Sequence, residues 1–271
     1  MLQITEKEYL QLSSYIRSHY GIKLGPEKRA LIMGRLGGTL AQKGLESFEA
    51  YYEYVMKDET GQAVFELLNK ITTNHTYFMR EPEHFRFFQK QVLPWIGSTA
   101  GNKDVRVWSA GCSRGQEPYT LAMIMQDYFG KDFDAWSTQI LATDISAQAL
   151  EAAQRGIYAS EEVASLPERW QKIHFQKLGQ DKYQVQQRLK KELILRSFNL
   201  MNEKFPFKKP FHAIFCRNVM IYFDAPTKKK LVKRFYQHLM PGGYLFIGHS
   251  ESLGRDNEGL LYVQPAVYRK E

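Results

Sequence analysis

Residues Val105–Gly115 read Val-Arg-Val-Trp-Ser-Ala-Gly-Cys-Ser-Arg-Gly, and this stretch decides the fold class. Its first four residues predict a strand, and the glycines after them predict a turn into a helix over about Glu117–Phe129. A second strand is expected at Ile140–Ala142, ending at Asp144. Strands that alternate with helices are typical of a parallel sheet with helices on both faces. The sequence therefore predicts an α/β fold.

The chain before this unit predicts a small all-helical N-terminal domain over residues 1–72, because apolar residues recur there at helical spacing. Thr5 and Glu8 form a capping-box pattern that starts the first helix, and Gly21 is expected to end it. Three further helices are expected from Pro26 to near Gly44, over Phe48–Met56 and over Gln62–Ile71. Residues 73–103 are expected to be a linker and a helix that begins at Pro82, and residues 104–271 the main domain.

An insert interrupts the main domain at about residues 157–196. Two short apolar runs, Tyr183–Val185 and Leu193–Leu195, predict strands of a small antiparallel sheet. The main fold is expected to resume with a strand at Phe211–Phe215, a strand at Tyr244–Ile247, and a last strand near Val263–Tyr268.

The composition sets limits on partners and location. The 271 residues carry a formal charge of +8, which favours an acidic partner: nucleic acid, an anionic membrane surface or an acidic protein. Cys112 and Cys216 form no Cys-x-x-Cys pair, so neither a disulfide framework nor a structural zinc site is expected. The chain shows neither a signal peptide nor a run of about 20 apolar residues, so we expect a cytoplasmic protein.

The glycine turn after the first strand indicates a ligand site without phosphate. Its glycines, Gly111 and Gly115, do not match the dinucleotide pattern G-x-G-x-x-G. Glu117 and Pro118 stand where a phosphate needs amides and positive charge, so an anionic pyrophosphate is disfavoured. A ligand with an ammonium group and a sulfonium, such as S-adenosylmethionine, fits better. The alternative is a tight turn that binds nothing.

Polar residues also follow the other strands. Asp144 can accept hydrogen bonds from two ribose hydroxyls, or it can cap the helix after it. Asn199 and the pair Arg217-Asn218 follow strands at the same edge, although an asparagine there can also be a turn residue. His84 and His249 have no metal partner at a recognisable spacing, so no metal site is expected.

A basic stripe marks the second helix. Four cations lie within an arc of about 100°: Lys28, Arg29, Arg35 and Lys43. Leu31, Ile32 and Leu36 lie among them, which favours a protein-binding face, whereas a purely solvated charged face is the alternative.

Four segments resemble the chemotaxis receptor glutamate methyltransferases, the CheR family. Residues 73–80 resemble that family's Asn-x-Thr-x-Phe-Phe-Arg segment, with Met79 in place of the second phenylalanine. Residues 111–119 resemble its cofactor loop, with Gln116 in place of a common glutamate. Residues 215–224 and 248–253 also resemble the family, and the likeness extends over nearly the whole chain.

This resemblance implies a Rossmann-like S-adenosylmethionine-dependent methyltransferase domain and a helical domain that contacts receptors. It implies that the following residues surround S-adenosylmethionine, with S-adenosylhomocysteine as the product: Asn74, Thr76, Arg80, Gly111, Glu117, Asp144, Asn199, Leu200, Arg217 and Asn218. Arg80 and Tyr222 would lie near the transferring methyl, and Lys28, Arg29, Arg35 and Lys43 are the candidate receptor-binding residues.

The implied partner is the cytoplasmic helical bundle of a chemotaxis receptor. We expect a monomer that does not insert into the membrane. Arg217-Asn218-Val-Met stands where base methyltransferases often carry Asn/Asp-Pro-Pro-aromatic, which argues against a nucleic-acid substrate. A non-catalytic module that binds S-adenosylmethionine remains open. Some family members hold a receptor's C-terminal peptide on the insert. The turn before Tyr183 is short here, so we predict no dependence on such a tether.

Overall fold

The computed structural model describes residues 2–72, 76–254 and 259–271. They form two compact units. One comprises Met1–His75 with Tyr222–Thr227, and the other comprises Thr76–Ile221 with Lys228–Glu271. The helical unit thus includes a short segment from far along the chain, Tyr222–Thr227. The predicted domain boundaries at residues 72 and 103 follow chain order and leave this segment in the main domain.

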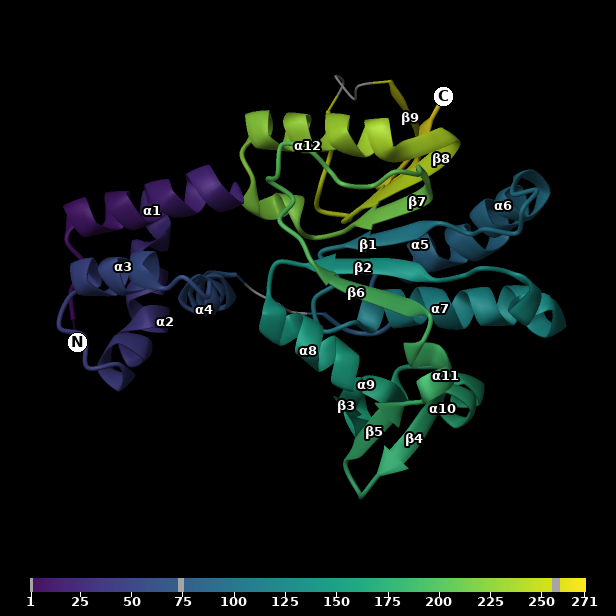
Figure 1. The fold of residues 1–271 in the computed structure, drawn as a ribbon, viewed down its shortest axis with the longest axis horizontal. Helices are drawn as coiled ribbons and strands as arrows, with labels where there is room; N and C mark the ends of the chain where they lie inside the picture. Colours follow the sequence, from purple (N-terminus) through teal and green to yellow (C-terminus); the bar gives the residue numbers. More distant parts are fainter. Residues whose placement is uncertain (1, 73–75, 255–258) are drawn as a thin grey trace. The chain divides into compact units, whose positions relative to one another are not determined.

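The first unit is helical, as the sequence predicts (Figure 1). Its elements are α1 (Glu6–Tyr20), η1 (Pro26–Lys28), α2 (Arg29–Gln42), α3 (Phe48–Lys57) and α4 (Gln62–Ile71). The capping box is confirmed, because the Thr5 side chain accepts from the Glu8 backbone N–H while the Glu8 side chain accepts from Thr5. Gly21 ends α1 with φ +70°, a conformation that glycine adopts without strain.

The core of this unit lies between the four α-helices. Ile16, Ile32, Leu36, Leu40 and Tyr51 are completely buried in it. The distant segment is held by backbone and charge contacts: Lys23 N–H donates to the Tyr222 carbonyl at 2.8 Å, and Arg17 pairs with Asp224 at 2.6 Å.

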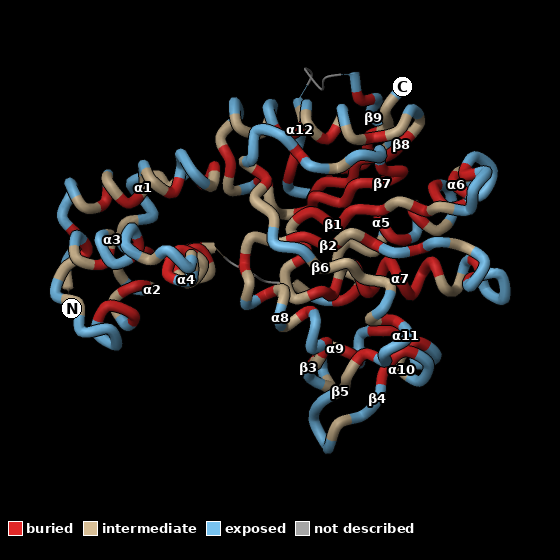
Figure 2. The backbone as a smooth tube through the Cα atoms, in the orientation of Figure 1, coloured by how far each residue is buried: buried red, intermediate tan, exposed pale blue. Residues whose placement is uncertain are grey.

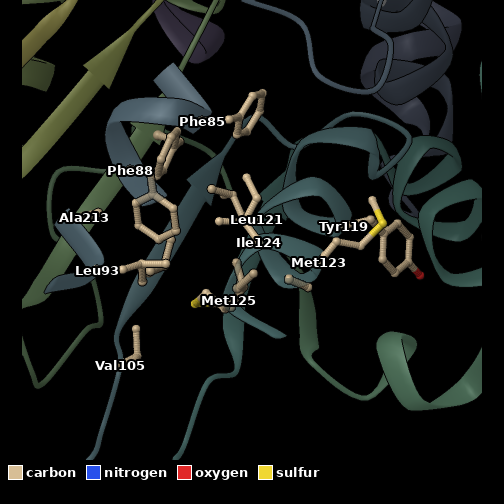
Figure 3. Close-up of a cluster of buried hydrophobic side chains, with 14 of the residues drawn as sticks. Phe85, Phe88, Leu93, Val105, Tyr119, Leu121, Met123, Ile124, Met125 and Ala213 are labelled. Atoms are coloured by element: carbon tan, nitrogen blue, oxygen red, sulfur yellow. The ribbon is translucent and has the colours of Figure 1, made fainter. Parts of the chain in front are cut away.

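The second unit begins with a helix that changes its pitch midway. It comprises α5 (Pro82–Phe87), a π-helical turn η2 (Phe88–Val92) and α6 (Leu93–Thr99). Pro94 has no N–H to donate to the preceding turn and its ring crowds that turn, which accounts for a wider turn just before it. Phe85 and Phe88 from this helix pack with Leu121 and Ile124 in the core of the unit (Figure 3).

The main sheet has seven strands in the order β6-β2-β1-β7-β8-β10-β9. Their bounds are β1 (Val107–Ala110), β2 (Ile140–Asp144), β6 (Leu193–Ser197), β7 (Phe211–Cys216), β8 (Leu239–Ile247), β9 (Leu260–Gln264) and β10 (Val267–Lys270). The first five strands in this order are parallel, and β10 is antiparallel to both β8 and β9. The carboxyl ends of the five parallel strands therefore meet at one edge.

The order of strands reverses at β1. The chain passes from β1 to β2 on one side, and later places β7 on the other side. In open α/β sheets this arrangement opens a crevice at the carboxyl ends of the strands, where ligands bind. The predicted loop at residues 111–115 begins at this point.

Both faces of the sheet are covered. The further helices along this part of the chain are α7 (Gln116–Phe129), η3 (Gly130–Ala135), α8 (Ala147–Arg155), η4 (Met220–Tyr222) and α12 (Ala225–His238). Tyr222–Thr227, at the end of η4 and the start of α12, count with the helical unit. Val107 belongs to the core cluster shared with α7, whereas Trp108 packs edge-on against Phe235 of α12. Strands β1 and β7 are buried along their whole length, as expected for central strands (Figure 2).

The antiparallel insert is present, but its composition corrects one prediction. Its sheet has the order β3-β5-β4, with β3 (Ile157–Ala159), β4 (Phe175–Leu178) and β5 (Lys182–Val185). Three short helices belong to it: α9 (Ser160–Ala164), α10 (Glu168–His174) and α11 (Gln187–Lys190). The prediction that Leu193–Leu195 is a strand of the insert is wrong. These residues belong to β6, which pairs in parallel with β2 of the main sheet.

The end of the chain also differs from the prediction. The single strand expected near Val263–Tyr268 is a hairpin, β9 and β10, with Ala266 at φ +62° in its turn. No helix among residues 2–72, 76–254 and 259–271 has the length and apolar character needed to cross a membrane.

Candidate functional site

The loop between β1 and α7 is fixed by its own backbone. Gly111 and Gly115 have φ +89° and +94°, and the N–H groups of Gly111 and Cys112 donate to the Thr143 carbonyl at the end of β2. A Cβ on Gly111 would lie 2.4 Å from Val219 Cγ2. Glycine is therefore required because the loop after β7 approaches closely, and the two loops share one corner of the sheet edge.

Asp144 lies at the end of β2 and faces this loop. Its two carboxylate oxygens accept from the backbone N–H groups of Ser113 at 2.8 Å and Ser146 at 2.9 Å. Ser146 supplies the side-chain cap of α8 by accepting from Ala149 N–H, so Asp144 is not the N-cap. Burial raises the pKa of Asp144, although the backbone N–H groups act in the opposite direction.

Spare hydrogen-bonding capacity remains beside Asp144. An ionised carboxylate has about four acceptor positions; Ser113 and Ser146 N–H use two here, and Ile145 N–H also acts on the group. The Ser113 hydroxyl is buried and makes no hydrogen bond. A carboxylate that accepts hydrogen bonds, beside a buried hydroxyl without a partner, suits a sugar diol, so these residues fit the ribose of a nucleoside.

Arg217 holds together residues from three segments. Its guanidinium bonds Glu117 at 3.0 Å and Glu81 at 3.1 Å, and it donates to the Arg80 carbonyl. Glu117 is fixed on its other side by the Ser109 hydroxyl at 2.7 Å. Arg217 is only 7% exposed, so this is a buried charge network in which each partner depends on the others.

Glu81 is the member that the sequence analysis missed. Burial acts to raise its pKa, but Arg217 and hydrogen bonds from Asn218 and His249 outweigh it, and the pKa lies below the usual value. Its φ is +57°, as is that of Met79, so the segment after residues 73–75 is wound tightly. An acidic residue before a helix proline resembles an ordinary first-turn charge, and no local signal marks it.

Glu251 is a second carboxylate to which the sequence analysis gives no role, although it lies in residues 248–253, which resemble the family. Its buried carboxylate accepts three backbone N–H groups, from Asn218 at 3.1 Å, Ile221 at 2.9 Å and Gly248 at 2.5 Å. Burial raises its pKa despite these bonds. The carboxylate thereby joins the loop after β7 to the loop after β8. Gly248 is required there, because a Cβ would lie 2.5 Å from Asn218 Nδ2.

The structure thus brings together several of the predicted cofactor residues. Arg217 contacts Glu117 and the Arg80 carbonyl, and Glu81 joins Arg217 to Asn218. Gly111 and Asp144 lie on the adjoining loop. The remaining predicted residues take these places: Asn199 closes a turn by accepting from Met201 N–H, Leu200 is buried, Thr76 is half-buried, Tyr222 belongs to the helical unit, and Asn74 lies outside the described residues.

The basic stripe on the second helix is largely engaged inside the helical unit. Arg29 pairs with Glu6 at 3.0 Å, Arg35 donates to the Lys70 and Ile71 carbonyls, and Lys43 pairs with Glu66 at 3.1 Å. Two of the apolar residues that lie among these cations, Ile32 and Leu36, are completely buried in the unit's own core, contrary to the predicted docking role. Side chains that fill a core do not form a docking face.

Comparison with known proteins identifies both parts of the chain. Residues 74–267 match the SAM-binding domain of CheR methyltransferases, and residues 7–72 match their all-alpha domain. The chain belongs to the CheR methyltransferase family. A chemotaxis protein methyltransferase of Borreliella burgdorferi is 42% identical over 99% of this chain and 96% of its own length. One from Escherichia coli is 35% identical over 93% and 88%.

The family resemblance and the fold class are therefore confirmed. Among solved structures, a glycopeptide N-methyltransferase in complex with S-adenosyl-L-methionine has a TM-score of 0.33 and 14% identity, covering 59% of this chain and 53% of its own. A likeness at that level carries no weight beside the CheR match, which extends over both units.

Proposed function

We propose that this CheR-family protein transfers the methyl group of S-adenosylmethionine to glutamate side chains of chemotaxis receptors, giving methyl esters. The observation that carries the proposal is Asp144, whose desolvated carboxylate faces the glycine loop with free acceptor capacity and does not cap the next helix. It supports nucleoside binding at the sheet edge. The identities of the curated relatives support the receptor substrate.

The reaction needs alignment more than acid–base chemistry. A glutamate side chain has a pKa near 4.3 and is already ionised at neutral pH. It attacks the methyl carbon without a general base, so the protein must align the reactants and remove water from the carboxylate. The site contains buried ion pairs, and carboxylates that hold backbone N–H groups in place, which suit it to aligning the reactants. We assign none of its residues as a base.

We assign roles to the site residues as follows. Asp144 accepts the ribose hydroxyls, while Glu117 and Arg217 offer charges of both signs to the amino-acid part of S-adenosylmethionine. Arg80, fixed by its carbonyl to Arg217, orients the incoming carboxylate. Tyr222 shapes or hydrogen-bonds the substrate. The remaining proposed cofactor residues are Asn74, Thr76, Gly111, Asn199, Leu200 and Asn218. Methyl transfer as proposed uses no metal.

We also propose that the helical unit recognises the receptor, and that the protein acts in the cytoplasm as a monomer. Lys28, Arg29, Arg35 and Lys43 stay candidates for this contact. Because three of the four already have partners within the unit, any receptor carboxylate must compete with those contacts.

A turnover assay tests the function. The purified protein is incubated with radiolabelled S-adenosylmethionine and receptor cytoplasmic fragments. We expect label on the receptor that mild alkali releases as methanol, since esters hydrolyse and N-methyl groups do not. Label that survives alkali or enters RNA would refute the substrate class, and binding of the cofactor without turnover would indicate a non-catalytic module.

A further inference from the structure

Three potential metal ligands converge beside the Arg217 network. Glu81 precedes α5, His84 lies in the first turn of that helix, and His249 follows β8. His84 Nδ1 lies 3.4 Å from a Glu81 oxygen, and the two imidazole rings are 4.6 Å apart with their planes at 83°. One ligand atom from each residue lies within 4.8 Å of the other two. The 3.4 Å separation equals the ligand–ligand spacing of a tetrahedral site with bonds of about 2.1 Å.

His84 gives an independent reason to expect a ligand. Its side chain is completely buried, yet neither ring nitrogen makes a well-formed hydrogen bond. The Glu81 oxygen and the Pro265 carbonyl are nearby but do not satisfy hydrogen-bond geometry with it. Buried polar nitrogens are rarely left without a partner, and metal coordination would satisfy one of these.

The three residues also offer suitable donor atoms. Imidazole nitrogens and carboxylate oxygens are both ligands that Zn²⁺ takes in proteins. His249 is exposed, which gives an ion a route to the site.

We propose that Glu81, His84 and His249 form a binding site for a divalent transition-metal ion such as Zn²⁺, with one position left open. Two imidazoles and one carboxylate are a ligand set found in zinc sites that keep a fourth position for water or substrate. The second oxygen of Glu81 is oriented by Asn218 Nδ2 and His249 N–H, both at 3.3 Å, as outer-shell partners orient metal-bound carboxylates. Imidazole ligands select against Mg²⁺ and Ca²⁺.

Arg217 opposes metal binding. It shares the Glu81 oxygen that lies nearest His84, so an ion must displace it from that oxygen. Arg217 would keep its contacts with Glu117 and with the Arg80 carbonyl. This competition limits the affinity and makes the site a reversible one rather than a permanent structural zinc centre.

The test uses the full chain with any histidine tag removed. Co²⁺ is titrated while its visible absorption is followed, and Zn²⁺ binding is measured by calorimetry. We expect one ion per chain, and loss of roughly tenfold or more in affinity in His249→Ala and in Glu81→Gln. His249 is exposed, so its replacement should leave the fold intact, which a thermal melt verifies. The matched control is His19→Ala, an exposed histidine of the helical unit, and it should bind as the wild type does.

Several outcomes overturn the site: no saturable binding of Zn²⁺ or Co²⁺, equal affinity in His249→Ala and the wild type, or a preference for Mg²⁺. Because these titrations need neither S-adenosylmethionine nor a receptor, their failure leaves the proposed methyl transfer untouched. Conversely, a protein that binds metal but transfers no methyl group would separate the two proposals.

Discussion

Replacing Asp144 with alanine tests the cofactor assignment directly. In the proposed complex its carboxylate accepts two ribose hydroxyls, and the variant loses both bonds. Hydrogen bonds to a charged group contribute about 1.5–3 kcal/mol each, and water recovers part of that in the variant. We expect a net loss of about 2–4 kcal/mol, which corresponds to a cofactor affinity reduced roughly 30-fold to 1,000-fold.

The same change also affects the free protein. Asp144→Ala removes acceptors from Ser113 and Ser146 N–H, which lowers stability. It also removes a carboxylate whose burial raises its pKa and so disfavours its charge, which offsets part of that loss. The fold should therefore survive, because Ser146, not Asp144, caps α8.

Calorimetry with S-adenosylhomocysteine and a denaturant melt measure the two effects separately. Asp132→Ala, at an exposed position in η3, is the matched control and should change neither. Unchanged affinity in Asp144→Ala would refute the ribose assignment. Loss of the folded state would show instead that the carboxylate is mainly structural.

The remaining predictions concern turnover, acid stability, the basic stripe and the insert. Arg80→Ala should lower turnover and weaken cofactor binding, whereas Tyr222→Phe should lower turnover only. Wild-type rates in both variants would show that neither residue belongs to the active site. Burial lowers the pKa of His84 and of His174 to about 4. Below pH 6.5 these histidines are therefore protonated in the unfolded chain but stay neutral in the folded chain. Stability should therefore fall from pH 7 to pH 5 by roughly 2 kcal/mol for each histidine, measured by urea titration, and a pH-independent midpoint would contradict this. Receptor methylation, but not cofactor affinity, should fall in a charge-reversed triple variant of Lys28, Arg29 and Arg35. A thermal melt of this variant must accompany the assay, because two of these cations have partners within the unit. Unchanged methylation would show that the stripe is an ordinary solvated face. With only three residues between β4 and β5, a receptor-tail pentapeptide should not bind at micromolar concentration, and receptors with and without tails should be methylated equally.

The sequence predicts those parts of the fold that depend on near neighbours. The capping box at Thr5 and the glycine end of α1 are set by residues within a few positions, and both are confirmed. Residues 62–71 were predicted as a helix, and the structure has those bounds. A strand followed by a glycine turn and a helix likewise carries its own signal.

Pairing between distant segments is what the sequence could not supply. A short apolar run such as Leu193–Leu195 fits an insert strand or an edge strand of the main sheet equally well, and only its partner β2 distinguishes them. The internal partners of the cations near α2 were out of reach for the same reason. A helical-wheel arc shows which cations share a side, but not that the Lys70 and Ile71 carbonyls accept from Arg35.

The site shows the same limit more strongly. Glu251 matters because Asn218, Ile221 and Gly248 point their N–H groups at it, and Glu81 matters because Arg217 lies beside it. Except for the local Gly248 contact, these contacts join residues at least 30 positions apart, so no spacing in the sequence marks them. The family resemblance supplied residues that it assigns to the cofactor, whereas these supporting carboxylates come only from the three-dimensional arrangement.

These carboxylates explain how the site keeps a shape that the backbone alone disfavours. Met79, Glu81 and Asn218 all have φ near +57°, a conformation that costs an ordinary residue about 1–2 kcal/mol. Glu251 fixes Asn218 through its N–H, and Glu81 is fixed by Arg217 and His249. The strain at Glu81 and Asn218 is thus offset by hydrogen bonds that the protein itself supplies. For a reaction that depends on alignment this matters, because loops held by the protein leave binding energy available to orient the substrate.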